Sequence, residues 1–188
     1  RMVRGSGLKG LVSLEKKTTF NKINLIRPLL NFNKKDLEFI SKQVFNFYII
    51  DTTNEDTKFT RTRIRNLIKE LEKNGLDKAK LFLTLKNLKK SNHALSIYVE
   101  KNKKSNSFYY KEKNELVLNE IFFNQPYEVV FRSISDSIKL VGGKYNAARG
   151  KKIDNILEKI SQNSLSKETL GGCVIKKVNQ TVIISKEY

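Results

Sequence analysis

The stretch that decides the fold is INLIRPLLNFNKKDLEFISKQVFNFYIID, residues Ile23–Asp51. It opens with an apolar run, Ile23–Leu30, that is typical of a short buried strand. Asn33 follows as a suitable N-cap, and the apolar residues after it recur at the spacing of one helix face. The run Phe47–Asp51 then predicts a second strand. Strand, helix and strand in succession predict a β-α-β unit, and therefore an open parallel sheet.

Two charged residues fall near the predicted carboxyl ends of these strands. Arg27 lies in the later part of the first strand, and Asp51 closes the second. In open parallel sheets, ligands bind beyond the carboxyl ends of the strands. We therefore take both residues as candidates for a binding or catalytic site.

The next stretch, TNEDTKFTRTRIRNLIKELEKNG (Thr53–Gly75), predicts a helix that Thr60 caps and Asn74-Gly75 stops. Its first turns carry Arg61, Arg63 and Arg65. Cations at this end oppose the helix macrodipole, so three of them favour a role in holding an anion together with the free N–H groups. The alternative is that they form ion pairs with Glu55, Asp56 and Glu70.

Beyond Asp77 the sequence favours helices and short hairpins. A long helix is predicted from Asp77 to about Lys101, with an apolar seam at alternating steps of four and three residues. This seam packs either within the domain or, alternatively, against a second copy in a homodimer. His93 lies off the seam and is predicted to face solvent.

The last part of the chain predicts two hairpins and two helices. The first hairpin pairs Phe108–Tyr110 with Leu116–Leu118, and the terminal one turns near Asn179-Gln180. Between them, one helix starts at Pro126 and ends at Gly142-Gly143, and another covers about residues 151–162. The composition changes most at residues 74–77. The predicted fold is therefore α/β, with an open parallel sheet over residues 1–75, followed by a mainly helical domain with small β-hairpins over residues 76–188.

The composition points to a polyanionic partner. The 188 residues include 37 Lys and Arg against 19 Asp and Glu, a net charge of +18. A plainer interpretation is that the lysines simply solvate the surface. One cysteine and one histidine cannot form a zinc-ligand set. No apolar run approaches the ~20 residues that span a bilayer, and no signal-peptide pattern is present, so a soluble, cytoplasmic protein is expected.

Near the start, Arg4-Gly5-Ser6-Gly7 forms a glycine-rich stretch next to cations. Such a stretch predicts a loop whose backbone N–H groups hold an anion. Taken alone, the pattern is too common to define one ligand.

Five stretches of the sequence are more informative together than each is alone. They are Arg4–Leu11, Ile26–Leu30, Asp51–Arg65, Thr169–Ile175 and Lys186-Glu187. They are similar, in this order, to the R-G-S/T-G-x-x-G-L loop, the V-R-P-L-L strand, the D-x-S/T-N and R-N-x-I-R motifs, and the closing segments of one family. That family is the tRNA(Ile)-lysidine synthetases, which belong to the N-type ATP pyrophosphatases. The resemblance covers nearly the whole chain.

The sequence departs from the family pattern in two places. Thr62 stands where the family has Asn in R-N-x-I-R, which puts an amide hydrogen bond from that position in doubt. The S-G-G-x-D-S pyrophosphate loop and the His/Asp-rich motif that follows it are not in this sequence. We therefore expect a chain that lacks the N-terminal pyrophosphate-loop part and is inactive alone. It would comprise the later part of the catalytic domain and the helical tRNA-recognition domain.

The resemblance implies an ATP-dependent ligation on RNA. The family adenylates O2 of the wobble cytidine in an isoleucine tRNA, and free lysine then displaces AMP to give lysidine. This implies ATP and Mg²⁺ as cofactors, and tRNA(Ile), ATP and free lysine as partners. The implied catalytic residues are Arg4, Asp51 and Arg61. The implied ATP- or lysine-binding residues are Gly5, Ser6, Gly7 and Arg27. The implied tRNA-binding residues are Lys9, Asn54, Arg63, Arg65 and Lys69, and no residue is assigned as a metal ligand.

Two other classes of function remain compatible with the charge. One is a stand-alone basic RNA-binding module without catalysis. The other is a DNA-binding or ribosomal protein, which would show no preference among tRNAs. A steep dependence of binding on salt is expected for all of them and so does not separate them.

Overall fold

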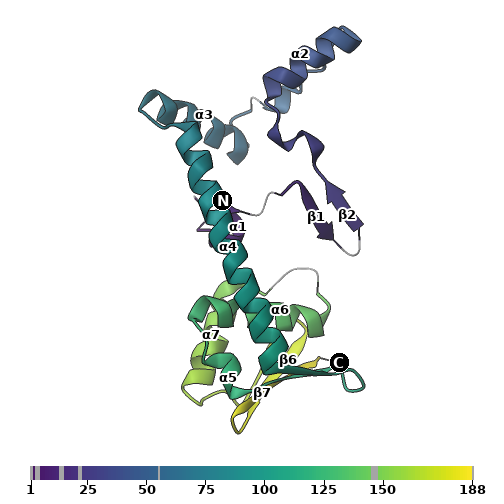
Figure 1. Ribbon diagram of the computed structural model, residues 1–188, viewed down its shortest axis with the longest axis vertical. Helices are drawn as coiled ribbons and strands as arrows, with labels where there is room; N and C mark the ends of the chain where they lie inside the picture. Colours follow the sequence, from purple (N-terminus) through teal and green to yellow (C-terminus); the bar gives the residue numbers. More distant parts are fainter. Residues whose placement is uncertain are drawn as a thin grey trace. The chain divides into compact units, whose positions relative to one another are not determined.

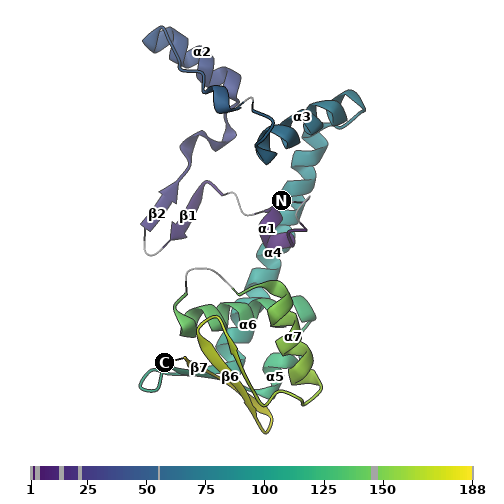
Figure 2. The ribbon, with the colours of Figure 1, turned by 180° about the vertical axis from the view of Figure 1, so that it is seen from behind.

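The computed structural model describes residues 2, 5–12, 15–20, 23–54, 56–144 and 148–187 (Figures 1 and 2). The chain divides into two compact units, which we call the N-terminal unit (residues 1–92) and the C-terminal unit (residues 93–188). This division falls inside one continuous helix. The domain boundary that the composition places between residues 75 and 76 stays a prediction.

The N-terminal unit is built from short helices and one small hairpin. Its elements are α1 (Leu8–Leu11), β1 (Lys17–Phe20), β2 (Ile23–Ile26), the 3-10 helix η2 (Pro28–Asn31), α2 (Lys34–Phe45), the 3-10 helix η3 (Thr52–Asn54), α3 (Thr60–Lys73) and the first part of α4 (Lys78–Asn106). Strands β1 and β2 pair antiparallel, with Lys17 opposite Ile26.

Helix α2 begins and ends where its sequence signals predict. Asn33 is the N-cap, and its backbone N–H donates to Oδ2 of Asp36 at 3.1 Å within a capping box. At the other end Asn46 adopts the left-handed conformation, with φ of 61°, and its N–H donates to the carbonyl of Lys42. The helix is therefore defined by local hydrogen bonds.

The predicted parallel β-α-β unit is wrong in detail. Residues 47–50 form no strand, and both sheets of the described residues are antiparallel. The first predicted strand is shorter, because Pro28 opens a 3-10 helix and proline has no N–H to donate to a sheet. The α/β class of this region stands, and a helix-rich part with small hairpins follows it.

The boundaries of the next two helices also differ slightly from the predictions. The N-cap of α3 is Phe59, and Thr60 is already helical; the carbonyl of Phe59 accepts from the N–H groups of Thr62 and Arg63. Helix α4 continues beyond Lys101 to Asn106. His93 is exposed, as predicted.

The C-terminal unit is a five-stranded antiparallel sheet with helices packed on it. Its elements after α4 are β3 (Ser107–Tyr110), β4 (Glu115–Leu118), α5 (Glu120–Phe123), α6 (Tyr127–Gly142), α7 (Gly150–Ser161), β5 (Lys167–Leu170), β6 (Cys173–Val178) and β7 (Thr181–Lys186). The strand order is β3-β4-β7-β6-β5. Both predicted hairpins are confirmed, whereas β5 was not predicted. Helix α6 packs on β4, β6 and β7, and α7 packs against α6 (Figure 1).

The core of this unit lies between the sheet and the helices. Alternate residues of the central strands are buried, as the period of two along a strand requires. They pack against apolar residues of α5, α6 and α7. The most enclosed large side chains are those of Phe122, Leu118, Ile134, Ile138, Ile153, Ile175 and Ile184. Enclosing each of them stabilises the fold by roughly 1.5–3 kcal/mol.

Two glycines allow the end of α6 to approach the β5–β6 turn closely. A Cβ atom on Gly142 would lie 2.2 Å from the carbonyl oxygen of Gly171. Gly171 itself has φ of 66°, and a Cβ there would lie 2.7 Å from Cγ2 of Ile138. The stretch Thr169–Ile175 therefore needs its glycine for packing as well as for the turn.

Next to this contact lies Cys173, the one cysteine of the chain. Its side chain is fully buried, and its Sγ lies 3.2 Å from the carbonyl oxygen of Ile138. Burial, with a smaller contribution from the carboxylate of Glu187, raises the pKa of the Cys173 thiol to about 11. The thiol is therefore protonated and shielded at neutral pH.

No helix within the described ranges has both the length and the apolar character that a bilayer span requires.

Candidate functional site

The best-defined polar loop of the N-terminal unit is formed by residues 51–54. The Oδ1 atom of Asp51 accepts hydrogen bonds from the backbone N–H of Thr53 at 2.9 Å and from the Thr53 hydroxyl at 2.6 Å. These bonds, the side-chain one above all, hold the pKa of Asp51 below its ordinary value of 3.8. The exposed carboxylate is therefore ionised at neutral pH and fixed in direction.

A second set of bonds attaches this loop to helix α3. Thr62 is buried, and its hydroxyl donates to the carbonyl oxygen of Asn54 at 3.2 Å. The Asn54 side chain donates to the carbonyl of Asp51 at 3.3 Å and accepts from Nη1 of Arg65 at 3.4 Å. Thr62 thus makes a hydrogen bond of its own at the position where the family has Asn.

The loop forms one wall of an open hollow of about 910 Å³ between α2 and α3. Polar side chains line it: Lys34, Glu38, Ser41, Tyr48, Asp51, Asn54, Thr62, Arg65, Asn66 and Lys69. Three of them are cationic, and one of these, Lys34, pairs with Glu38 at 3.2 Å. The hollow therefore presents one fixed carboxylate beside cations, which suits a ligand that carries both charges.

The structure brings four of the predicted site residues together. Asp51, Asn54, Arg65 and Lys69 all line the hollow. Lys34, Ser41 and Asn66 share its lining, and the sequence reasoning missed them. The signal for Lys34 and Ser41 was weak, because they belong to a different helix from the arginines and only folding places them opposite α3.

Two other arginines of α3 lie outside this lining. Arg61 and Arg63 are exposed, and Nη2 of Arg63 lies 3.4 Å from the hydroxyl of Thr60. Among the described residues, neither Asp56 nor Glu70 forms an ion pair with an arginine of this helix. The alternative of intramolecular pairing therefore gains no support from these two acids, and Glu55 lies outside the described residues.

The glycine-rich stretch at the start is described only in part. The prediction for Arg4 lies outside the described residues. Gly5 has φ of 65°. Gly7 is the N-cap of α1, and the carbonyl of Gly7 accepts from the N–H groups of Gly10 and Leu11. Open space surrounds both Gly5 and Gly7 where a Cβ would stand. Ser6 is half-buried and Lys9 is exposed. None of these residues lines the hollow between α2 and α3.

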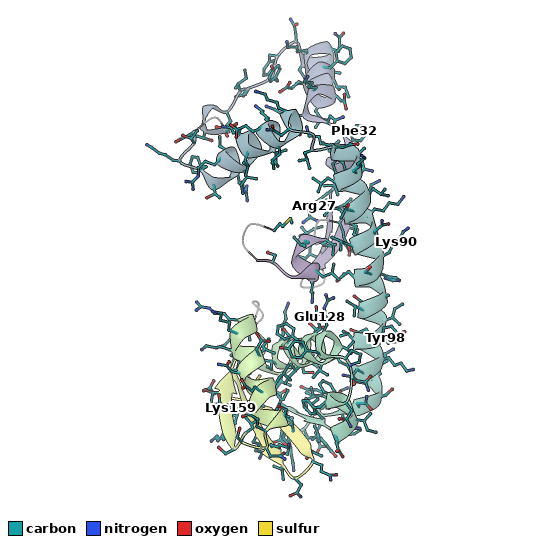
Figure 3. The ribbon with its side chains drawn as sticks, turned by 90° about the vertical axis from the view of Figure 1, so that its left-hand side faces the viewer. Arg27, Phe32, Lys90, Tyr98, Glu128 and Lys159 are labelled. Carbon is teal, nitrogen blue, oxygen red and sulfur yellow. The ribbon has the colours of Figure 1, made fainter. Side chains whose placement is uncertain are left out.

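Arg27 braces the small hairpin. Its Nη1 atom donates to the carbonyl oxygen of Glu15 at 3.2 Å and to the hydroxyl of Thr18 at 3.0 Å. The side chain is drawn in Figure 3. At least one nitrogen of this guanidinium group therefore serves the fold, and the predicted contact with ATP or lysine would have to use the others.

The described residues do not offer a metal centre. No group of three or more His, Cys, Asp or Glu side chains in that part of the chain is arranged to hold a metal ion. Asp51 is the single carboxylate in the polar loop. The donor set therefore does not fit Mg²⁺ by itself, and we derive no step through that ion.

Comparisons with known proteins show what the chain is similar to. Residues 1–71 match the family model of the PP-loop domain, which is the class of domain that this part of the chain resembles. Over its whole length the chain is homologous to proteins named tRNA(Ile)-lysidine synthase, as its motifs predict. The expectation that the pyrophosphate-loop part is lacking is wrong in detail, because the match to the PP-loop domain begins at residue 1.

Three relatives illustrate the extent of the similarity. The protein from Wolbachia pipientis wMel is 31% identical over the full chain, which covers 44% of the relative. The one from Anaplasma marginale is 30% identical over 93% of the chain and 38% of the relative. The one from Orientia tsutsugamushi is 27% identical over the full chain and 44% of the relative. The chain thus spans less than half the length of these relatives.

Proposed function

We propose that this chain is part of a tRNA(Ile)-lysidine synthase, a ligase that forms a carbon–nitrogen bond. In this reaction O2 of the wobble cytidine of an isoleucine tRNA attacks the α-phosphate of ATP, which forms the adenylated cytidine and releases pyrophosphate. The amine of free lysine then attacks C2 and expels AMP. The observation that carries the proposal is the similarity along the entire chain to relatives with that name.

Four polar residues of the hollow have roles in this proposal. Asp51 attracts the ammonium group of lysine, since its carboxylate is exposed, ionised and fixed by Thr53. Arg65 and Lys69, with the amide of Asn54, hold phosphate oxygens at the rim. Negative charge develops on the phosphate when AMP leaves, and fixed cations stabilise that charge.

The remaining predicted residues act around this centre in the same proposal. Arg4 and Arg61 stabilise the reacting phosphate, and Gly5, Ser6, Gly7 and Arg27 contact ATP or lysine. Arg63 and Lys9 hold the tRNA backbone, a contact that positions the RNA without specifying sequence. Because tRNA, ATP and lysine meet in the cytoplasm, we propose that location. Mg²⁺ would accompany ATP. A homodimer is the alternative to packing of the apolar seam within the domain.

The test is transfer of labelled lysine to isoleucine tRNA in the presence of ATP. We expect incorporation by a synthase of full length that contains this chain. Asp51→Asn should reduce the rate at least about tenfold, which corresponds to about 1.4 kcal/mol of transition-state stabilisation. Asp56→Asn is the matched control, since Asp56 does not line the hollow.

Two results would contradict the proposal. One is a full-length synthase containing this chain that binds ATP and tRNA but transfers no lysine. The other is an Asp51→Asn variant as active as the Asp56→Asn control. Binding of many RNAs without any transfer of lysine would favour the second candidate, a basic RNA-binding module. The net charge of +18 supports that candidate.

A further inference from the structure

One face of the five-stranded sheet is not covered by the helices of the C-terminal unit, and we call it the outer face. A single row of opposed residues crosses it: Phe108, Val117, Ile183, Lys176 and Lys167. Residues directly opposite one another in a sheet share a face. None of the five is buried, whereas the residues before and after Val117 and Ile183 along their strands belong to the core.

Two aromatic side chains stand at one edge of the outer face. Phe108 and Tyr110 are alternate residues of the edge strand β3, and they are 60% and 50% exposed. Their ring centroids lie 4.6 Å apart with an angle of 66° between the planes. Each ring is held by the other, yet each keeps a surface open to solvent. Exposed rings on a sheet are surfaces on which the bases of unpaired RNA stack.

Cations flank this aromatic pair. Lys111 and Lys113 lie in the turn between β3 and β4, and both are exposed. Lys176 stands three strand spacings away from Phe108, about 14 Å, and Lys167 one spacing further. The carboxylates in the same region are Glu112 in the turn and Glu115 opposite Tyr110. Lysines outnumber them, in keeping with the net charge of the chain.

We propose that the outer face of this sheet binds an unpaired segment of RNA. Bases stack on Phe108 and Tyr110, and phosphates meet Lys167 and Lys176 across the sheet. Duplex and unpaired RNA both carry phosphates, so an electrostatic surface alone would bind both. Duplex RNA offers no free base faces, so an aromatic surface favours unpaired RNA. The inference rests on the proposed function for the identity of the RNA, which would be an unpaired region of the tRNA.

A fluorescence experiment tests the contact directly, because the chain contains no tryptophan. Phe108→Trp gives the full chain a single reporter on the outer face. Its emission should be quenched by a short unpaired RNA oligonucleotide and much less by the same RNA annealed to its complement. Tyr98→Trp is the matched control, since Tyr98 is 61% exposed and projects from α4 (Figure 3). Its emission should change little with either RNA.

Affinity measurements add a loss-of-function test. The double variant Phe108→Ala/Tyr110→Ala should raise the Kd of the full chain for isoleucine tRNA about tenfold, and Tyr98→Ala should leave it unchanged. Lys167→Gln/Lys176→Gln should weaken binding and lower the slope of affinity against salt concentration. Phe108→Tyr retains a ring and should retain the affinity of the parent chain.

Three outcomes would overturn the inference. The first is quenching of the Phe108→Trp reporter that is equal for unpaired and duplex RNA, and the second is no quenching at all. The third is self-association of the chain that is lost in the Phe108→Ala/Tyr110→Ala variant, which would assign the outer face to a second copy. If a full-length synthase containing this chain transfers no lysine while the Phe108→Trp reporter is still quenched by unpaired RNA, the proposed function is wrong and the RNA contact stands. If lysine is transferred but the reporter is not quenched, the RNA contact is wrong and the proposed function stands.

Discussion

The two units of the chain differ in how much apolar surface each encloses by itself. In the C-terminal unit a continuous core joins the sheet to α5, α6 and α7. In the described part of the N-terminal unit, Val12 is the one buried apolar side chain. Three apolar residues of α2, Phe39, Val44 and Phe45, are each at least 64% exposed.

This difference separates two sources of structure. Helix α2 has a capping box and a left-handed C-cap, so local hydrogen bonds define its ends without a core beneath it. The C-terminal sheet depends on side chains that are far apart in sequence, such as Phe122 and Ile184. Stability should therefore be concentrated in the C-terminal unit, where apolar area is removed from water.

The largest expected effect tests whether stability is concentrated in the C-terminal unit. Phe122→Ala should lower the free energy of unfolding of the C-terminal unit by about 3–5 kcal/mol, because the ring is fully enclosed and its removal leaves a cavity. A urea titration followed by thiol labelling of Cys173 measures it, since that thiol becomes reactive only when the core opens.

The matched substitution lies in the N-terminal unit. Phe39→Ala removes the same ring from a side chain that is 64% exposed, and it should change the free energy of unfolding by less than about 0.5 kcal/mol. A cost similar to that of Phe122→Ala would show that the apolar face of α2 is enclosed in solution, and the comparison between the units would fail.

A smaller effect concerns the one buried polar side chain described in the N-terminal unit. Thr62→Val keeps the shape of the residue but removes the hydrogen bond to the carbonyl of Asn54, at a cost of about 1 kcal/mol. Faster amide hydrogen exchange in residues 51–54 would report the loosened loop. Thr84→Val is the control, because the exposed hydroxyl of Thr84 bonds only within its own helix. Equal exchange in the two variants would contradict the role given to Thr62.

The smallest effect is a change in titration. Thr53→Ala removes the main cause that lowers the pKa of Asp51, so the pKa should rise toward its ordinary value, as an NMR titration can measure. A lowered pKa in the folded state stabilises the fold above the unfolded pKa, and this contribution is lost as the pH falls through the folded pKa. Thr53→Ala should therefore flatten the acid limb of local stability below pH 3.8. An unchanged Asp51 pKa would refute this account of the loop.

The sequence predicted the elements with local signals and missed those that depend on distant partners. Asn33, Pro126 and Gly143 mark helix ends that the structure confirms. Strand β5 was missed, because Lys167–Leu170 is short and its pairing with β6 is its main support. Residues 47–50 are apolar enough for a strand, but a strand forms only where a neighbour pairs with it.

The candidate site was predicted only in part for the same reason. Asp51, Asn54 and Arg65 are close in sequence, and their motif placed them together before the structure did. Lys34 and Ser41 come from another helix, so no spacing rule connects them to α3. The hydrogen bond from Arg27 reaches Thr18 on the other strand of the hairpin, and no helical or strand period indicates that contact.

The buried thiol of Cys173 has a practical consequence for spectroscopy. Because the native chain shields its one sulfhydryl, a cysteine introduced on the surface of either unit would react alone with a maleimide or nitroxide reagent. Pairs of such labels, one in each unit, would report the distance between the units and its change when RNA is added, with no need to replace the native residue.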